Sequence, residues 1–291
     1  MSDRTVALAA AAILGSIISV NVGAAVAKGI FPAVGPEGIA ALRSSIAALI
    51  LVPLVRPWRA RLTPAQWRWI VLYGLCMGGM NLLIYWSFSY IPIGAAVAIE
   101  IVGPLAVVLL GSRSRADFLW LALACGGLAL LVPWTDGAAE LDPRGIALAL
   151  AAALFWAAYI LFGKQASQVE GRVVVALGLV FASCVTLPIG IAHAGTALLE
   201  PHILAIGFGI ALLSSCLPYM LEMFALGRLS PRLFGLIISG APAIAALAAF
   251  AVLGERLTGQ QWVAVLLMIA ASAGAAVTGR PAVSRPREDV S

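Results

Sequence analysis

Residues 6–27 read VALAAAAILGSIISVNVGAAVA and contain no charged side chain. A helix needs about 20 consecutive apolar residues to cross the hydrocarbon core of a bilayer, and this stretch is long enough. It is also longer than the roughly 7–15 apolar residues of a secretory signal. Arg4 precedes it, and Ala25-Val26-Ala27 imitates a cleavage site, but the length favours a first membrane helix that is retained in the protein.

Further apolar stretches of similar length follow along the whole chain, and the connectors are too short to form a soluble domain. The predicted membrane helices span residues 6–27, 38–55, 69–90, 93–111, 117–134, 145–163, 173–193, 203–225, 232–252 and 260–279. The 291 residues are 62% hydrophobic and 11% charged, with a mean hydropathy of +1.04. Soluble domains are about 45–50% apolar and about 25% charged. We therefore exclude a cytoplasmic enzyme and a nucleic-acid-binding module, and predict an all-α integral membrane protein with ten transmembrane helices.

The basic residues are distributed unevenly between the two sides that these spans define. Short cytoplasmic loops carry an excess of Lys and Arg. If both termini are cytoplasmic, the cytoplasmic segments hold Arg4, Arg56, Arg59, Arg61, Arg68, Arg113, Arg115, Lys164, Arg172, Arg228, Arg232, Arg280, Arg285 and Arg287. The opposite side holds only Lys28, Arg144 and Arg256. The sequence thus predicts a multi-pass protein with cytoplasmic N- and C-termini.

The chain also resembles two copies of one unit. Its two lysines, Lys28 and Lys164, follow the first and sixth spans, and Gly103-Pro104 in the fourth span aligns with Ala241-Pro242 in the ninth. We predict a first repeat at residues 1–138, a second at residues 139–280 and a disordered cytoplasmic tail at residues 281–291. Because each repeat has five spans, the second is inverted in the membrane. Inverted repeats are typical of secondary transporters, whose sites lie near the midplane between the repeats.

Three ionisable residues fall inside the predicted spans: Arg43, Glu100 and Glu222. A charge at the bilayer centre costs about 2.5–3.5 kcal/mol on insertion scales, so such residues are candidates for function. Arg43 and Glu100 lie at similar depth from the same face. They are candidates for an ion pair, which either locks helices together or handles a charged substrate or a proton. Glu222 lies closer to the inner face, where it either belongs to the site or reaches out to the interface.

Uncharged polar residues supply weaker candidates for the same site. Asn81 and Tyr85 are one helical turn apart and therefore share a face. Ser214, Ser215 and Tyr219 do the same in the eighth span, and Asn21 lies in the first span. Interhelical hydrogen bonds are the simpler explanation for any one of them. Several on helices that line a common space favour a substrate or proton site.

Helix-breaking residues occur inside two of the predicted spans. Gly103, Pro104 and Pro242 lie near the middle of the fourth and ninth spans. Proline frees backbone carbonyl groups, which other helices or a cavity must satisfy. The matching positions in the two halves favour a role in gating over a simple kink.

Together these features resemble the drug/metabolite transporter superfamily with paired EamA-type repeats, and within it the threonine/homoserine exporter branch. The resemblance covers essentially the whole chain and rests on residues 27–35 (AKGIFPAVG), 41–43 (ALR), 78–81 (GGMN), 98–107 (AIEIVGPLAV), 217–229 (LPYMLEMFALGRL) and 253–258 (LGERLT). It implies proton-coupled export of small amino acids across a bacterial inner membrane. It also implies a central cavity lined by both halves, with the fifth and tenth spans peripheral.

One departure makes the two halves unequal. The second half has Gly254-Glu255-Arg256-Leu257-Thr258 after its ninth span, whereas the first half has Gly111-Ser112-Arg113-Ser114-Arg115, with no acid at that point. Repeat symmetry therefore cannot assign equal roles to the two halves. The resemblance also leaves the substrate open, because related carriers export different molecules.

The sequence leaves one main functional alternative. In the first hypothesis Arg43 holds the carboxylate of an amino acid, and Glu100 holds its ammonium group or a competing proton. In the second, the same fold exports another metabolite or a drug cation and Glu100 alone recognises it. An enzyme is not expected, because the sequence shows no cluster of His, Asp or activated Ser. No metal or organic cofactor is expected either, and the proton-motive force would drive transport. A helix-surface position for both charges would favour a structural protein. The expected partners are the substrate and the lipid bilayer, and the carrier is a monomer or a homodimer.

Overall fold

The structure is a computed structural model that describes residues 3–110, 115–131, 141–166, 169–218, 220–221, 237–238 and 240–278, and in those residues every regular element is a helix. The helices are α1 (Asp3–Gly29), α2 (Phe31–Val55), η1 (Pro57–Arg59), α3 (Pro64–Phe88), α4 (Ile93–Glu100), α5 (Val102–Leu110), α6 (Arg115–Leu131), α7 (Pro143–Ala166), α8 (Gly171–Ala194), η2 (Gly195–Leu199), α9 (Pro201–Ala211), η3 (Leu212–Cys216), α12 (Ala241–Leu253) and α13 (Gly259–Thr278). Five of the apolar helices are long enough to cross a membrane alone. The predicted all-α membrane architecture is confirmed.

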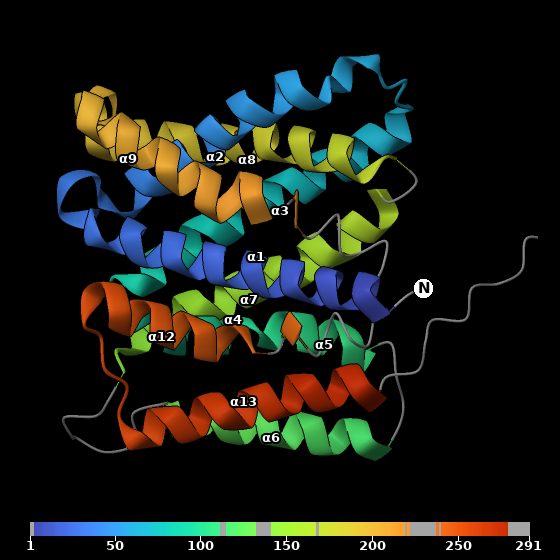
Figure 1. The fold of residues 1–291 in the computed structure, drawn as a ribbon, viewed down its shortest axis with the longest axis vertical. Helices are drawn as coiled ribbons and strands as arrows, with labels where there is room; N and C mark the ends of the chain where they lie inside the picture. Colours follow the sequence, from blue (N-terminus) through green and yellow to red (C-terminus); the bar gives the residue numbers. More distant parts are fainter. Residues whose placement is uncertain are drawn as a thin grey trace, which may run out of the picture.

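Consecutive helices run back and forth between the two ends of the bundle (Figure 1). The end at which α1 finishes and α2 begins is called the Lys28 end, and the opposite end, where α1 begins, is called the Asp3 end. Helices α6 and α13 pack on each other at one edge of the molecule, far from α2, α8 and α9. The fifth and tenth spans are therefore peripheral. Helices α2, α8 and α9 lie at the opposite edge, and α1, α3, α4, α7 and α12 lie between the two edges.

Helices of the first half pack mainly on helices of the second half. Helix α2 packs on α8, α6 on α13 and α4 on α12. Helix α3 packs on α7, and the equivalent pair in the other half is α9 and η3 packing on α1. This set of pairs is unchanged when each helix is exchanged for its equivalent in the other half, which is the pattern that a twofold relation between the halves produces. The boundary between the repeats near residue 138 remains a prediction, because residues 132–140 lie outside the described part of the chain.

Small residues allow the helices of the two halves to approach closely. A Cβ atom at Gly74 or Gly78 of α3 would lie 2.6 Å and 2.8 Å from the carbonyl oxygens of Gly178 and Ala182 on α8. Lipid chains are as apolar as the side chains they replace, so helix association in a membrane depends on such close packing. The crossing of α3 and α8 brings the middle of the third span into the centre of the bundle.

Three predicted spans differ from the structure in an informative way. Helix α2 begins at Phe31, not at residue 38, and continues through a kink where Gly35 has φ = +68°, a conformation that favours glycine. The fourth span is divided at Ile101 into α4 and α5, and the eighth widens into the π-helical turn η3. Proline explains the break at Ile101 and the π-helical turn η3, as described below, because it cannot donate the backbone hydrogen bond that a regular helix requires.

Candidate functional site

Arg43 lies halfway along α2 and directs its guanidinium group into a polar cluster between the halves. Its Nη1 atom donates to the side-chain oxygen of Asn81 at 3.1 Å and its Nε atom donates to the Ser215 hydroxyl at 3.1 Å. Its Nη2 atom donates to the backbone carbonyl of Ser214 at 2.9 Å. Asn81 is on α3 of the first half and the serines are on η3 of the second. Groups from both repeats therefore meet at mid-height in the bundle.

Helix α3 supplies two of these groups from one face. Asn81 and Tyr85 are one turn apart, and both are buried. The Tyr85 hydroxyl accepts a longer hydrogen bond of 3.5 Å from Arg43, whose Cζ atom lies 5.9 Å from the centre of the Tyr85 ring. Phe31 and Phe88 pack edge-on against that ring. The spacing of Asn81 and Tyr85 in the sequence thus indicated their common face, and the structure brings both to Arg43.

The π-helical turn η3 supplies the other groups, and Pro218 explains why they are available. The backbone N–H of Leu217 donates to the carbonyl of Leu212, five residues earlier. In α-helical spacing the carbonyl of Ser214 would accept from residue 218, which is a proline without an N–H. That carbonyl accepts from Arg43 instead. The sequence-based list of site residues left out Ser214, Ser215 and Pro218, although the two serines had been noted with Tyr219 as polar residues on one face of the eighth span. Their signal was two serines followed by a proline inside an apolar span.

Glu100 is buried at the end of α4, and its side chain is 8% exposed. The break after it follows from Pro104, because a helix would pair the Pro104 nitrogen with the Glu100 carbonyl and proline has no N–H to donate. Among the described residues, Arg43 and Glu100 do not form the direct ion pair that was expected. Glu100 is therefore placed in the apolar interior by its burial and not by a contact with Arg43.

The other predicted site residues have different positions. Asn21 donates a hydrogen bond of 2.8 Å to the carbonyl of Ile17, one turn earlier on α1. Gly103 lies against the α7 backbone, since a Cβ atom there would be 2.1 Å from the Ala153 carbonyl oxygen. Pro242 lies in the first turn of α12, where a proline needs no N–H. A turn at Gly240 separates α12 from the helical residues 237–238, and the gating role of Pro242 stays a prediction. Tyr219 and Glu222 lie outside the described residues.

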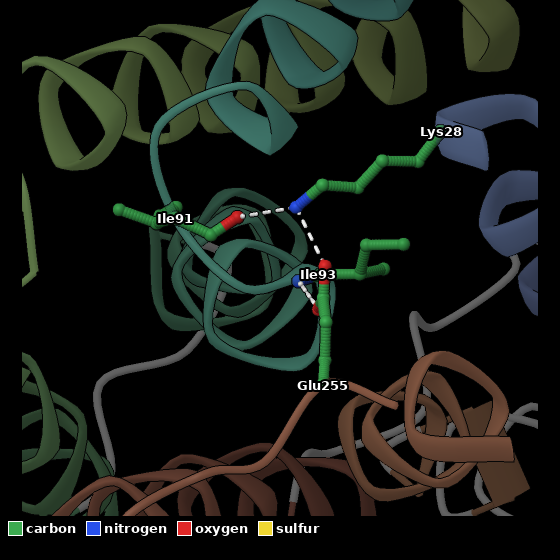
Figure 2. A network of polar contacts seen from close by, with 4 residues as sticks. All are labelled: Lys28, Ile91, Ile93 and Glu255. Atoms are coloured by element: carbon green, nitrogen blue, oxygen red, sulfur yellow. Dashed lines mark hydrogen bonds and ion pairs between the residues drawn. The ribbon is translucent and has the colours of Figure 1, made fainter. Parts of the chain in front are cut away.

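A second polar cluster lies at the Lys28 end of the bundle (Figure 2). The Lys28 ammonium group forms an ion pair of 2.6 Å with Glu255 and donates to the carbonyl of Ile91 at 3.3 Å. The other Glu255 oxygen accepts from the backbone N–H of Ile93 at 3.0 Å. Ile93 begins α4, so this carboxylate caps a helix whose first N–H groups have no partner within the helix. The cluster joins the end of α1, the turn between α3 and α4, and the linker between α12 and α13.

The structure offers no evident metal ligands in its described part, where no three His, Cys, Asp or Glu side chains gather. The site is instead a set of hydrogen-bonding groups inside an apolar helical bundle. Fold and site together define a multi-pass membrane protein of the transporter class, with polar groups from both repeats meeting in its interior.

Comparison with known proteins identifies the family. The model of the EamA-like transporter family matches residues 143–277. The threonine/homoserine exporter RhtA of Salmonella typhimurium strain LT2 is 45% identical over 268 residues, which cover 92% of this chain and 91% of that protein. The protein of the same name from Escherichia coli K12 is 43% identical over the same shares. The chain belongs to the EamA-like transporter family.

A solved crystal structure supports the fold independently. It matches with a TM-score of 0.61, covers 96% of this chain and 98% of that chain, and is 18% identical in sequence. At this identity the likeness concerns the fold alone. It extends over both halves of the chain.

Proposed function

We propose that this chain exports threonine, homoserine or a similar small amino acid across a bacterial inner membrane by proton-coupled alternating access. The observation that carries the proposal is the meeting of Arg43 with polar groups from both halves, at mid-height, in a chain 43–45% identical to two threonine/homoserine exporters. Transporters built from inverted repeats place their substrates at this level, between the repeats.

The chemistry of the cluster suits an amino-acid zwitterion. A guanidinium group offers a planar fork of donors that matches a carboxylate, so Arg43 is assigned to the substrate carboxylate. The Asn81 amide and the Tyr85 and Ser215 hydroxyl groups form hydrogen bonds to Arg43 and are available to a hydroxylated substrate. Their role in binding rests on this geometry.

Glu100 is assigned to coupling. Burial makes the charged form of its carboxyl group costly, so the group binds a proton or an ammonium cation readily. A proton and the substrate ammonium group then compete for the same carboxylate. That competition exchanges one for the other across the membrane.

The orientation follows from the distribution of basic residues. We place both termini and the Asp3 end in the cytoplasm and the Lys28 end outside, with the repeats at residues 1–138 and 139–280 rocking against each other. Reporter fusions that are active only in the cytoplasm, joined to each terminus in turn, test this placement. Activity at one terminus only would contradict it. The carrier is proposed to work as a monomer or homodimer, which the mass of the purified protein in detergent distinguishes.

The experiment that tests the function is growth on inhibitory homoserine or threonine. Cells overproducing the chain are compared with cells producing Arg43→Ala, Glu100→Gln or the control Arg172→Ala, whose side chain is 66% exposed in a surface pair with Glu170. The amount of each protein in the membrane is measured in parallel. The proposal expects resistance from the wild type and Arg172→Ala, and its loss in the other two variants.

Two results would overturn parts of the proposal. Unchanged sensitivity of cells with wild-type protein in the membrane would exclude these substrates. Inhibition by aromatic cations, in place of small amino acids, would then favour export of another metabolite or a drug cation through Glu100. If Glu100→Gln transported at the wild-type rate with the wild-type pH dependence, the coupling role of Glu100 would be wrong.

A further inference from the structure

Helix α1 holds the π-helical turn η3 through two positions on one of its faces. The Ser19 hydroxyl donates a hydrogen bond of 2.6 Å to the carbonyl of Leu213. One turn further along α1, Gly23 lies directly against the turn. A Cβ atom on Gly23 would be 2.2 Å from the Ser214 hydroxyl oxygen, 3.2 Å from the Leu213 Cβ atom and 3.4 Å from the Ser214 Cβ atom. The absence of a side chain at Gly23 thus allows this approach.

The turn that Gly23 supports is the one that meets Arg43. Pro218 has no N–H to donate. It lies five residues after Leu213, where a π-helix would place the donor for the Leu213 carbonyl, and four residues after Ser214, where an α-helix would place the donor for the Ser214 carbonyl. Ser19 of α1 satisfies the first and Arg43 of α2 satisfies the second. Two adjacent carbonyl groups of one turn are therefore held by two different helices, and a displacement at α1 is passed to the guanidinium group.

We propose that Gly23 is a positioning residue for Arg43: its missing side chain places η3 so that the Ser214 carbonyl and the Ser215 hydroxyl orient the guanidinium fork toward the substrate carboxylate. The inference rests on the proposed function in one respect only, the assignment of Arg43 to the carboxylate. Gly23 itself does not touch the substrate in this account. It acts through Ser214 of η3.

The effect of adding one methyl group at Gly23 follows from the contacts. Rotation of the Ser214 hydroxyl about χ1 relieves the shortest contact but not the contact with the Leu213 Cβ atom, which at 3.2 Å stays tighter than ordinary van der Waals distance. The Ser214 Cβ atom, at 3.4 Å, lies at the limit of ordinary contact. The turn must then shift away from α1 and carry the Ser214 carbonyl with it. Misplacement of a positioned group by about 1 Å can cost about a hundredfold in rate, so a shift of a few tenths is expected to matter.

The test compares alanine at two glycines of the same helix. Gly23→Ala and the control Gly15→Ala are reconstituted in liposomes, and the KM and kcat for threonine and homoserine are measured. Among the residues that the structure describes, the new methyl group at Gly15 meets only Leu221 Cδ1, at an ordinary 3.6 Å. Both changes add the same atoms and the same helix propensity. We expect the KM of Gly23→Ala to rise about tenfold with a smaller change in kcat, while Gly15→Ala keeps the wild-type values.

A second substitution identifies the contact responsible. The Ser214 hydroxyl is buried and has no hydrogen-bond partner within the described part of the chain, and Ser214→Ala removes the atom nearest to the new methyl group. We expect Gly23→Ala to raise the KM less in the Ser214→Ala background than in the wild type. The inference is overturned if Gly23→Ala raises the KM equally in both backgrounds, or if it behaves like Gly15→Ala.

The same question can be decided without a transported substrate. If the wild type carries neither threonine nor homoserine, the proposed function fails, and the unfolding temperature in detergent tests the inference by itself. Gly23→Ala is measured with Arg43 present and in the Arg43→Met background. We expect a smaller drop in the Arg43→Met background, because the contact that Gly23 supports is already lost there. Equal drops in both backgrounds would show that Gly23 does not act through Arg43.

Discussion

The two polar clusters of the bundle differ in which groups meet the cation and in what they connect. At the Lys28 end, a flexible ammonium group meets the Glu255 carboxylate, and that carboxylate also caps α4. In the interior, the planar fork of Arg43 meets an amide, two hydroxyl groups and a backbone carbonyl on α3 and η3. The first cluster joins chain segments near their ends. The second joins the two halves in the middle, where a substrate of an alternating-access carrier binds.

The comparison teaches that charge alone does not identify a site in a membrane protein. Lys28 and Arg43 are both cations in a largely apolar bundle. The Lys28 ion pair, however, joins the end of α1 to the linker between α12 and α13, and it contributes mainly to holding these segments together. A guanidinium fork whose acceptors are distributed over both halves responds to any relative movement of the halves. We therefore expect substitutions at the Lys28 end to change stability more than substrate affinity, and substitutions in the interior to do the opposite.

Arg43→Met is expected to have the largest effect on transport. It removes every donor of the fork while keeping an apolar side chain of similar length, and the loss of a group that binds a substrate carboxylate is expected to lower kcat/KM about a hundredfold or more. Uptake of labelled threonine into liposomes measures it. Arg43→Lys, which keeps the charge but not the fork, is the matched variant and should recover only a small part. Full recovery by lysine would show that the planar geometry is irrelevant.

Glu255→Leu is expected to have the largest effect on stability. It leaves Lys28 without its carboxylate and the Ile93 N–H without its acceptor at a position where the Glu255 side chain is 19% exposed. We expect a loss of about 2 kcal/mol, less than for a fully buried pair because solvent screens the charges. The unfolding temperature in detergent reports it. A KM within about twofold of the wild type is expected if the Lys28 end does not contact substrate.

Glu255→Gln separates the ion pair from the helix cap. Glutamine keeps an oxygen for the Ile93 N–H and loses the charge that meets Lys28, so its cost is expected to be about 1 kcal/mol, half that of leucine. In a double-mutant cycle, Lys28→Met should cost less in the Glu255→Gln background than in the wild type. Additive costs would show that the ion pair contributes nothing and that only the cap matters.

Tyr85→Phe is expected to have the smallest effect. The hydrogen bond from Arg43 to its hydroxyl is long, at 3.5 Å, and the ring contacts with Phe31 and Phe88 remain in phenylalanine. We expect a rise in the KM of at most about threefold. Asn81→Leu, which removes an acceptor at 3.1 Å, should raise the KM more. The reverse order would indicate that the Tyr85 hydroxyl contacts the substrate directly.

The sequence predicted the helices well because the length of an apolar run is a local property. Each of α1, α3, α7 and α8 lies within a few residues of its expected span. The irregular points were harder to locate. Pro104 was recognised as a break, but the structure places it one turn after the break at Ile101, because proline disturbs the hydrogen bond to the residue four positions earlier.

The site was predicted in part for the same reason. Asn81 and Tyr85 share a helix face by spacing alone, and both contact Arg43. The expected Arg43–Glu100 ion pair was wrong in its geometry, since equal depth in two helices does not specify the rotation of either helix. The contact between Lys28 and Glu255 was not predicted, although both residues had been noticed as landmarks of the repeat. Pairing residues so distant along the chain requires the packing of three segments.

The sequence by itself determined that this chain is a helical membrane protein with charges in its interior. Each helix satisfies its own backbone hydrogen bonds, and the length of its apolar stretch can be counted from the local sequence. The tertiary structure alone decided which polar groups meet. Arg43 finds the carbonyl of Ser214 because α1 can approach η3 at Gly23 and because Pro218 leaves that carbonyl without a helical donor. Such contacts depend on how helices rotate and approach one another, and close packing of small residues sets both.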